Sequence, residues 1–221
     1  MTINQAAGAF TNNFGVNLAT LAVTNVTIGD YRLVSVEISS VSFTATGVSG
    51  GGVTTWTKIV EGTENTNYLA VFGGVVTATG AQTISVTYSS VPGVNCELWS
   101  SELVWSGGVP SSWTPRASGV LANTSSTTVT FPSLVSASGT DQAYFGFCSV
   151  TGNAIAGSSS GFTYSTVNGN GNLALFNGTL AASTAYQPIC TQDTTGVSGT
   201  NGVIVQVNVA ASPTGNLLAF C

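Results

Sequence analysis

The chain has 221 residues, of which only 5% are charged, and it contains no histidine. The formal net charge is −5, and the three cations Arg32, Lys58 and Arg116 are scattered along the sequence. A nucleic-acid binder needs a basic patch that displaces counterions, so this composition argues against DNA or RNA as a partner. The absence of histidine excludes Ser-His-Asp and Cys-His catalytic arrangements and the usual zinc sites.

Strand-like runs with period-two alternation follow one another along the chain, and no window has the sustained 3.6-residue apolar period of a helix. Residues 6–23 predict one or two strands. The further predicted strands, in chain order, are 31–39, 56–60, 68–76, 82–88, 97–105, 127–131, 142–150, 162–166, 172–180, 186–191 and 202–210. Turn clusters rich in glycine, at 49–52, 91–93, 106–108 and 168–171, separate them.

This pattern predicts an all-β fold with antiparallel sheets. Alternating faces are typical of sheets that pack on one side only, and many strands with Gly-rich turns favour a sandwich. A chain of this length is ample to bury a core as one domain.

An internal repeat is the most informative feature of the sequence. Residues 69–76 (LAVFGGVV) are similar to 173–180 (LALFNGTL), and the strands before and after them also correspond. Two separate domains, or half-sandwiches interleaved into one jelly roll, would both give this pattern. We favour a single jelly-roll-like antiparallel sandwich from two similar half-units, because about five strands per half need a second sheet to cover them.

The predicted organisation follows from this repeat. It comprises an N-terminal arm with the first strand or strands, a duplicated sandwich, a bridge between its halves, and a C-terminal tail. The corresponding residues are 1–28 for the arm, 29–210 for the sandwich with half-units 29–107 and 127–210, 108–126 for the bridge, and 211–221 for the tail.

An ordered set of short motifs carries a family resemblance. The set comprises 29–36 (GDYRLVSV), 55–60 (TWTKIV), 72–80, 83–87, 104–107 (VWSG), 161–163 (GFT) and the final valine-rich strand. Over roughly residues 29–210 the chain resembles a β-sandwich module of actinobacterial phage virion proteins and some large bacterial surface proteins. The resemblance implies a minor tail or capsid-decoration protein, and it carries over no functional residues, because the pattern contains no catalytic set.

The remaining groups of residues that could act in catalysis or bind a metal give only weak signals, so we predict no enzyme, no cofactor and no metal centre. Glu97 and Glu102 are five residues apart and should point to opposite faces of one strand, unlike the paired carboxylates of a glycosidase. Glu61 and Glu64 are interpreted as solvated turn charges. A weak calcium site of loop carbonyls with one acid remains open.

The other candidates are tryptophans and cysteines. Trp56, Trp99 and Trp105 are interpreted as core residues, although four tryptophans could also form a sugar-stacking platform. Cys96, Cys148 and Cys190 are interpreted as buried free thiols, and a disulfide among them is the alternative.

Two segments are candidates for binding a partner. Trp113 lies next to Arg116 in the Pro-rich bridge, where it either plugs the junction between the halves or is an exposed anchor. In the tail, Leu217, Leu218 and Phe220 belong either to a frayed terminus or to an arm laid along a neighbouring subunit.

The predicted function is therefore a structural virion protein of a tailed phage, in an oligomer or lattice with other virion subunits. The start of the chain has no secretory signal pattern and no apolar run reaches the roughly 18 residues of a membrane helix, so we expect synthesis in the host cytoplasm, no membrane partner and a place in the virion. The alternative is a carbohydrate- or receptor-binding adhesion module that contacts a host-surface glycan.

Overall fold

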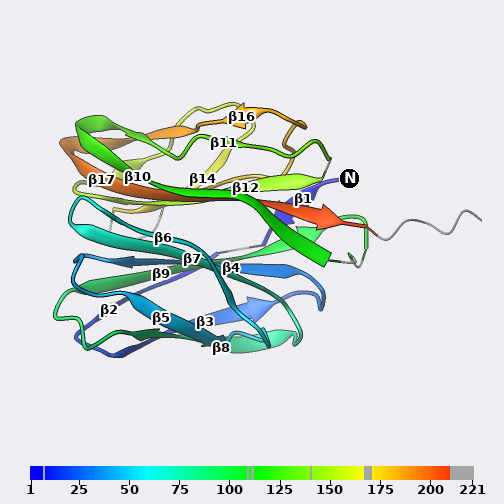
Figure 1. Cartoon of the computed structure of the whole chain (residues 1–221), viewed down its shortest axis with the longest axis horizontal. Helices are drawn as coiled ribbons and strands as arrows, with labels where there is room; N and C mark the ends of the chain where they lie inside the picture. Colours follow the sequence, from blue (N-terminus) through cyan, green and yellow to red (C-terminus); the bar gives the residue numbers. More distant parts are fainter. Residues whose placement is uncertain (7, 109, 111, 140, 167–170, 210–221) are drawn as a thin grey trace, which may run out of the picture.

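The computed structural model describes residues 1–6, 8–108, 110, 112–139, 141–166 and 171–209. These residues form antiparallel strands in four stacked layers and no helix, so the predicted all-β antiparallel sandwich class is confirmed (Figure 1). No helix long and apolar enough to cross a membrane occurs in this part of the chain.

Two main sheets form the middle of the stack. The first main sheet has the strand order β1 (Ile3–Gln5), β9 (Asn95–Trp105), β4 (Tyr31–Ile38), β7 (Asn67–Val75) and β6 (Thr57–Glu64), with β2 (Ala9–Phe14) also paired to β9. The second main sheet has the order β10 (Ser112–Thr130), β17 (Ile189–Asn208), β12 (Gln142–Val150), β15 (Leu173–Asn177) and β14 (Thr163–Thr166), with β13 (Ala154–Ile155) also paired to β17.

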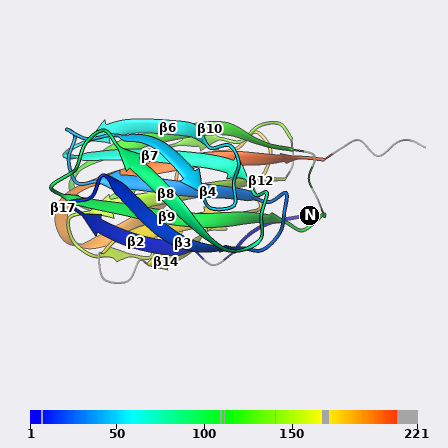
Figure 2. The same ribbon diagram turned by 90° about the horizontal axis from the view of Figure 1, so that it is seen from below.

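Two smaller sheets cover the outer faces of the main sheets. The first outer sheet consists of β3 (Leu18–Asn25), β8 (Gly80–Tyr88) and β5 (Ala45–Gly50). The second outer sheet pairs β11 (Leu134–Val135) with β16 (Ala185–Tyr186). Figure 2 shows the same stack from below, with β3 and β8 toward the viewer.

Three apolar cores fill the gaps between the four layers. The core between the main sheets contains Leu33, Trp99, Phe145 and Val205. Two further cores lie under the first outer sheet and under the second outer sheet. The central strands of the main sheets are consequently buried on both faces, as all eight residues of β4 show. The expectation of sheets packed on one side only is therefore wrong for them, and it holds for β3, whose residues alternate between exposed and buried.

The two main sheets have matching strand orders. Strands β9, β4, β7 and β6 lie in the same sequence as β17, β12, β15 and β14. Each main sheet contains strands from one half of the chain only, so the half-units are stacked and do not interleave as in a jelly roll. Pairing within each half is the shorter connection, which explains why stacking replaces interleaving. The domain boundaries themselves remain a prediction.

The segment 108–126 was expected to be a bridge without strand character, and that expectation is wrong. Residues from Ser112 onward belong to β10, which pairs along most of its length with the long strand β17. Serine, glycine and proline make β10 a weak strand by propensity. Its edge position tolerates Pro115, which stands next to a register shift, and the valines of β17 supply the packing.

Candidate functional site

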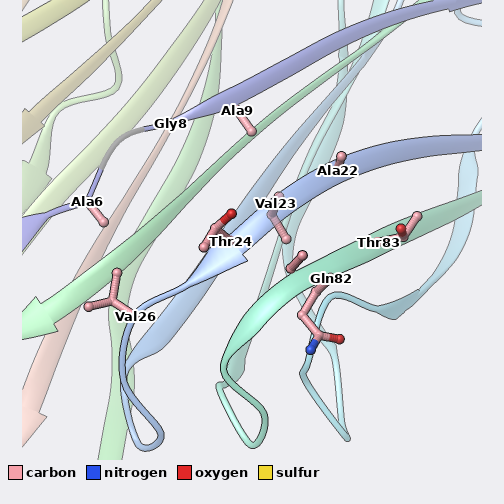
Figure 3. Close-up of a pocket in the computed structure, with 10 residues that line it drawn as sticks. Ala6, Gly8, Ala9, Ala22, Val23, Thr24, Val26, Gln82 and Thr83 are labelled. Atoms are coloured by element: carbon pink, nitrogen blue, oxygen red, sulfur yellow. The ribbon is translucent and has the colours of Figure 1, made fainter.

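A cleft of about 700 Å³ lies between two edge strands. Strands β2 and β3 are joined by residues 15–17, which carry the chain from the first main sheet to the first outer sheet. The two strands diverge from this turn, so the cleft opens between the start of β2 and the end of β3 (Figure 3). The lining residues are Ala6, Gly8, Ala9, Ala22, Val23, Thr24, Val26, Ala81, Gln82 and Thr83.

The lining is small and uncharged. Ala9 and Ala22 lie on facing strands across the opening (Figure 3). A side chain at Gly8 would collide with the indole ring of Trp99, so glycine lets the backbone cross close over this ring. The lining residues of this cleft carry no charge, and they offer apolar contact together with hydroxyl, amide and backbone polar groups.

A buried ion pair lies beside the inner end of the cleft. Arg32 Nη2 donates to Glu102 Oε2 at 2.8 Å and to the carbonyl of Thr24 at 3.0 Å. Glu102 in turn accepts from the backbone N–H of Val26 at 2.9 Å and of Thr27 at 3.3 Å. The pair thus holds the end of β3 and the loop after it against the first main sheet.

Asp30 adds a second acid to this region. Burial, together with the negative charge of Glu102, raises the pKa of Asp30 from 3.8 to about 6. Hydrogen bonds from the backbone of Trp105 and the side chain of Thr27 act in the opposite direction, but burial and the charge of Glu102 outweigh them, so a charged Asp30 is disfavoured.

A second group of buried acids lies on the opposite face of the same two strands. Glu37 of β4 stands directly opposite Glu97 of β9, and both are buried. Burial, followed by the charge of Glu97, raises the pKa of Glu37 from 4.5 to about 8. Ser39 Oγ donates to Glu37 Oε1 at 3.2 Å, and Asn172 Nδ2 of the second half donates to Glu97 Oε2. The neutral form of Glu37 is therefore favoured at neutral pH.

A small polar hollow of about 180 Å³ lies next to these acids. Ser39 and Ser149, whose hydroxyls bond to Glu37, line it together with Glu64 and Asn67. Asn67 Nδ2 donates to Ser149 Oγ at 3.0 Å and so links the two halves. Glu37 and Glu97 are buried and are not among the residues that line the hollow.

The sequence prediction for Glu97 and Glu102 is confirmed, since Glu102 contacts the loop after β3 while Glu97 contacts Asn172 on the other face. Sequence reasoning missed the pairing of Glu37 with Glu97. A glutamate in the middle of an apolar run was the available signal at 31–39, but its partner depends on strand register.

Trp113 is buried and is not an exposed anchor, which corrects its candidacy as a partner-binding residue. Its indole N–H donates to the carbonyl of Gly29 at 2.7 Å, and its ring stacks on Tyr31 at 5.7 Å between centroids. These contacts join β10 to the first main sheet, so Trp113 plugs the junction of the halves. Burying a large ring with its N–H satisfied is favourable, whereas exposing it is not.

Arg116 is exposed on β10, and its Nε donates to Gln206 Oε1 at 2.6 Å. Together with Lys58 of β6 it lines a shallow hollow of about 400 Å³. Lys58 is already paired with Glu61 at 2.7 Å. The structure therefore does not bring Arg116 and Trp113 into one site. Leu217, Leu218 and Phe220 lie outside the described residues.

None of the four tryptophans is exposed, which removes the predicted alternative of a sugar-stacking platform. Trp99 and Trp105 are buried in the core, as predicted, and Trp56 is half-buried with its N–H bonded to the carbonyl of Gly50. Cys96, Cys148 and Cys190 are buried free thiols, with 3.9 Å between the last two sulfur atoms.

Within the described residues, no three histidine, cysteine, aspartate or glutamate side chains gather as a metal site would require. The chain matches no family model, no curated protein and no solved structure.

Proposed function

We propose that this chain is a structural virion protein of a tailed phage, in the role of a minor tail or capsid-decoration protein that acts through protein–protein contacts. The observation that carries the proposal is the near absence of charge on the surface. Five of the eleven charged residues are buried, namely Asp30, Arg32, Glu37, Glu97 and Glu102.

A surface with six charged side chains consists mainly of Ser, Thr, Asn, Gly and scattered aliphatic groups. Such a surface has little electrostatic resistance to association, because charge repulsion is what keeps many proteins apart. When this surface packs against a neighbour, few charged side chains must give up their hydration shells, so its burial in an assembly has a small desolvation cost. The motif resemblance to phage virion modules supports the same role.

At one end of the first half, further apolar groups lie in or beside the three loops 15–17, 39–44 and 89–94. Phe14, Leu18, Val41 and Val91 are 67%, 52%, 48% and 56% exposed. Backbone bonds from Tyr88 and neighbouring residues hold these three loops together. Exposed apolar groups on adjoining loops are typical of contact surfaces.

Mass spectrometry of purified phage particles, encoded by the genome that carries this sequence, tests the proposal. We expect the polypeptide at a fixed copy number per particle, and gold-labelled antibodies in electron micrographs should mark the head or the tail. Particles that lack the polypeptide and remain infectious would overturn the proposal.

A further inference from the structure

Two of the buried cysteines contact each other in the core of the second half. Cys148 lies in β12 and Cys190 lies at the start of β17, and neither side chain is exposed to solvent. Their sulfur atoms are 3.9 Å apart. Cys96 lies in the core under the first outer sheet, where its Sγ donates to the carbonyl of Val94 and no second cysteine of the described chain is present. The fold thus buries one thiol alone and two thiols in contact.

This contact results from a bend in the long strand β17. Within the second main sheet, Cys148 pairs with Thr200, which comes ten residues after Cys190. A straight strand would separate Cys190 from Thr200 by about 33 Å. Register shifts between Asn123 and Thr128 of β10 bend the paired strands, so the start of β17 crosses back over β12. A bond between the two sulfur atoms would therefore join two layers of the second half.

We propose that Cys148 and Cys190 are a site of oxidation, at which a disulfide bond cross-links the start of β17 to the face of β12. The structure shows this site in its reduced form. A disulfide has about 2.05 Å between its sulfur atoms, so each side chain must move toward the other by about 1 Å. In the described residues no third cysteine, histidine, aspartate or glutamate joins the pair, so it lacks the ligands of a zinc site.

The layer that this bond would hold has little backbone pairing of its own. Strands β11 and β16 pair over two residues, and β13 pairs with β17 over two residues. In the first outer sheet, by contrast, β3, β5 and β8 have eight, six and nine residues. A cross-link lowers the entropy of the unfolded chain, more so for a long loop, and Cys148 and Cys190 are 42 positions apart. The cysteine pair thus lies under the outer layer that gains most from a covalent bond.

The oxidant is a small-molecule disulfide such as oxidised glutathione. The thiolate of one cysteine attacks a sulfur atom of this disulfide and breaks its S–S bond, which forms a mixed disulfide and releases one glutathione thiolate. The second cysteine thiolate then attacks the protein sulfur of the mixed disulfide and releases the other glutathione. Two protein thiols are thereby oxidised, one glutathione disulfide is reduced to two thiols, and the two protons pass from the cysteines to glutathione.

Burial favours this reaction during folding over the same reaction in the folded chain. Burial, followed by the neighbouring thiol of Cys190, raises the pKa of Cys148 well above its usual value of 9. The thiolate, which is the attacking species, is therefore scarce at neutral pH, and neither sulfur is open to solvent. We expect the bond to form as the chain folds in an oxidising medium and to resist reduction once it is buried.

Oxidising refolding of the purified full chain tests this proposal. The reduced, unfolded chain is refolded with reduced and oxidised glutathione, and the thiols that remain are alkylated with N-ethylmaleimide in guanidinium chloride. Intact mass spectrometry counts the adducts. The chain has four cysteines, so we expect two adducts after oxidising refolding and four after refolding with a reductant. The thermal midpoint of the oxidised chain should be higher by about 5–15 °C.

Cys190→Ala and Cys96→Ala are matched variants, because each removes one buried thiol. Cys190→Ala should keep three free thiols and the same thermal midpoint in both media. Cys96→Ala should keep the bridge and the rise in thermal midpoint. The adduct count of the wild type does not depend on whether either variant folds.

Four adducts in the wild type after oxidising refolding would overturn the inference. A bridge to Cys96 or Cys221, located by chymotryptic peptide mapping, would overturn it as well, and so would glutathione that stays attached to Cys148 or Cys190. A bridge that leaves the thermal midpoint unchanged would show that the bond does not stabilise the outer layer, which also contradicts the proposal. The inference does not depend on the virion role, since it concerns a bond within one chain.

Discussion

Strands β4 and β9 carry two buried pairs of ionisable residues, one on each face, and the pairs differ in electrostatic balance. Arg32 stands opposite Glu102 on the face toward the first outer sheet. Glu37 stands opposite Glu97 on the face toward the second main sheet, with neutral Ser and Asn donors around them. In both pairs the two residues stand directly opposite each other on β4 and β9. The comparison teaches that burial of the first pair is compensated by an opposite charge, whereas burial of the second pair is compensated by protonation of Glu37.

The largest expected effect comes from removing the cation of the first pair. Arg32→Met leaves Glu102 buried without its counter-charge, and we expect the free energy of unfolding to fall by about 3–5 kcal/mol. Urea unfolding followed by tryptophan fluorescence measures this change. Arg116→Met, at an exposed arginine, is the control and should cost less than about 1 kcal/mol. A loss below about 1 kcal/mol for Arg32→Met would show that the pair is not needed to compensate burial.

The next effect concerns the proton of the second pair. Because the pKa of Glu37 rises from 4.5 unfolded to about 8 folded, the folded state binds more protons between these values. Stability from this group is therefore fully present below pH 4.5 and is lost as the pH rises through 8. Between pH 4.5 and 7 the loss should be about 3 kcal/mol. Glu37→Gln keeps the neutral form and should remove this part of the pH dependence.

Chemical unfolding at a series of pH values measures the difference between wild type and Glu37→Gln. The other titratable side chains that act on Glu37 are Glu97, Cys96 and Tyr88, and the pKa of Cys96 is about 11, outside this window. Glu61→Gln is the control, because it removes a surface carboxylate whose pKa is lowered by Lys58 and leaves Glu37 in place. Its stability should still fall between pH 4.5 and 7, as in the wild type. Parallel pH profiles for wild type and Glu37→Gln would contradict a raised pKa of Glu37 in the folded state.

The sequence predicts the strands of the core well, because their apolar alternation is strong. It fails for β10, where Ser, Gly and Pro conceal an edge strand that is ordered by pairing with β17. It also fails for the stacking of the half-units. A strand buried on both faces, such as β4, is distinguished from a one-sided strand only by the neighbours that cover it.

The candidate sites show the same limit. The opposite orientation of Glu97 and Glu102 follows from their spacing, which sequence reveals. The pairing of Glu37 with Glu97 and the cleft beside β3 depend on register and on which strands lie at an edge. The two interpretations of Trp113 could be separated only by the position of Tyr31 and Gly29 in space.

The smallest expected effect is a difference in unfolding free energy between alanine variants of two adjacent serines, which lie on opposite faces of β9. Ser100 Oγ accepts from Arg32 Nη1 at 3.2 Å and donates to the carbonyl of Leu33, on the charged face. Ser101 Oγ donates to the carbonyl of Ala6, and no charge takes part. Since hydrogen bonds to charged groups contribute more, Ser100→Ala should cost about 2 kcal/mol and Ser101→Ala about 1 kcal/mol in urea unfolding. Equal costs, or a larger cost for Ser101→Ala, would mean that the charge of Arg32 is compensated by Glu102 and Thr24 alone, and that Ser100 acts only as a neutral strand contact.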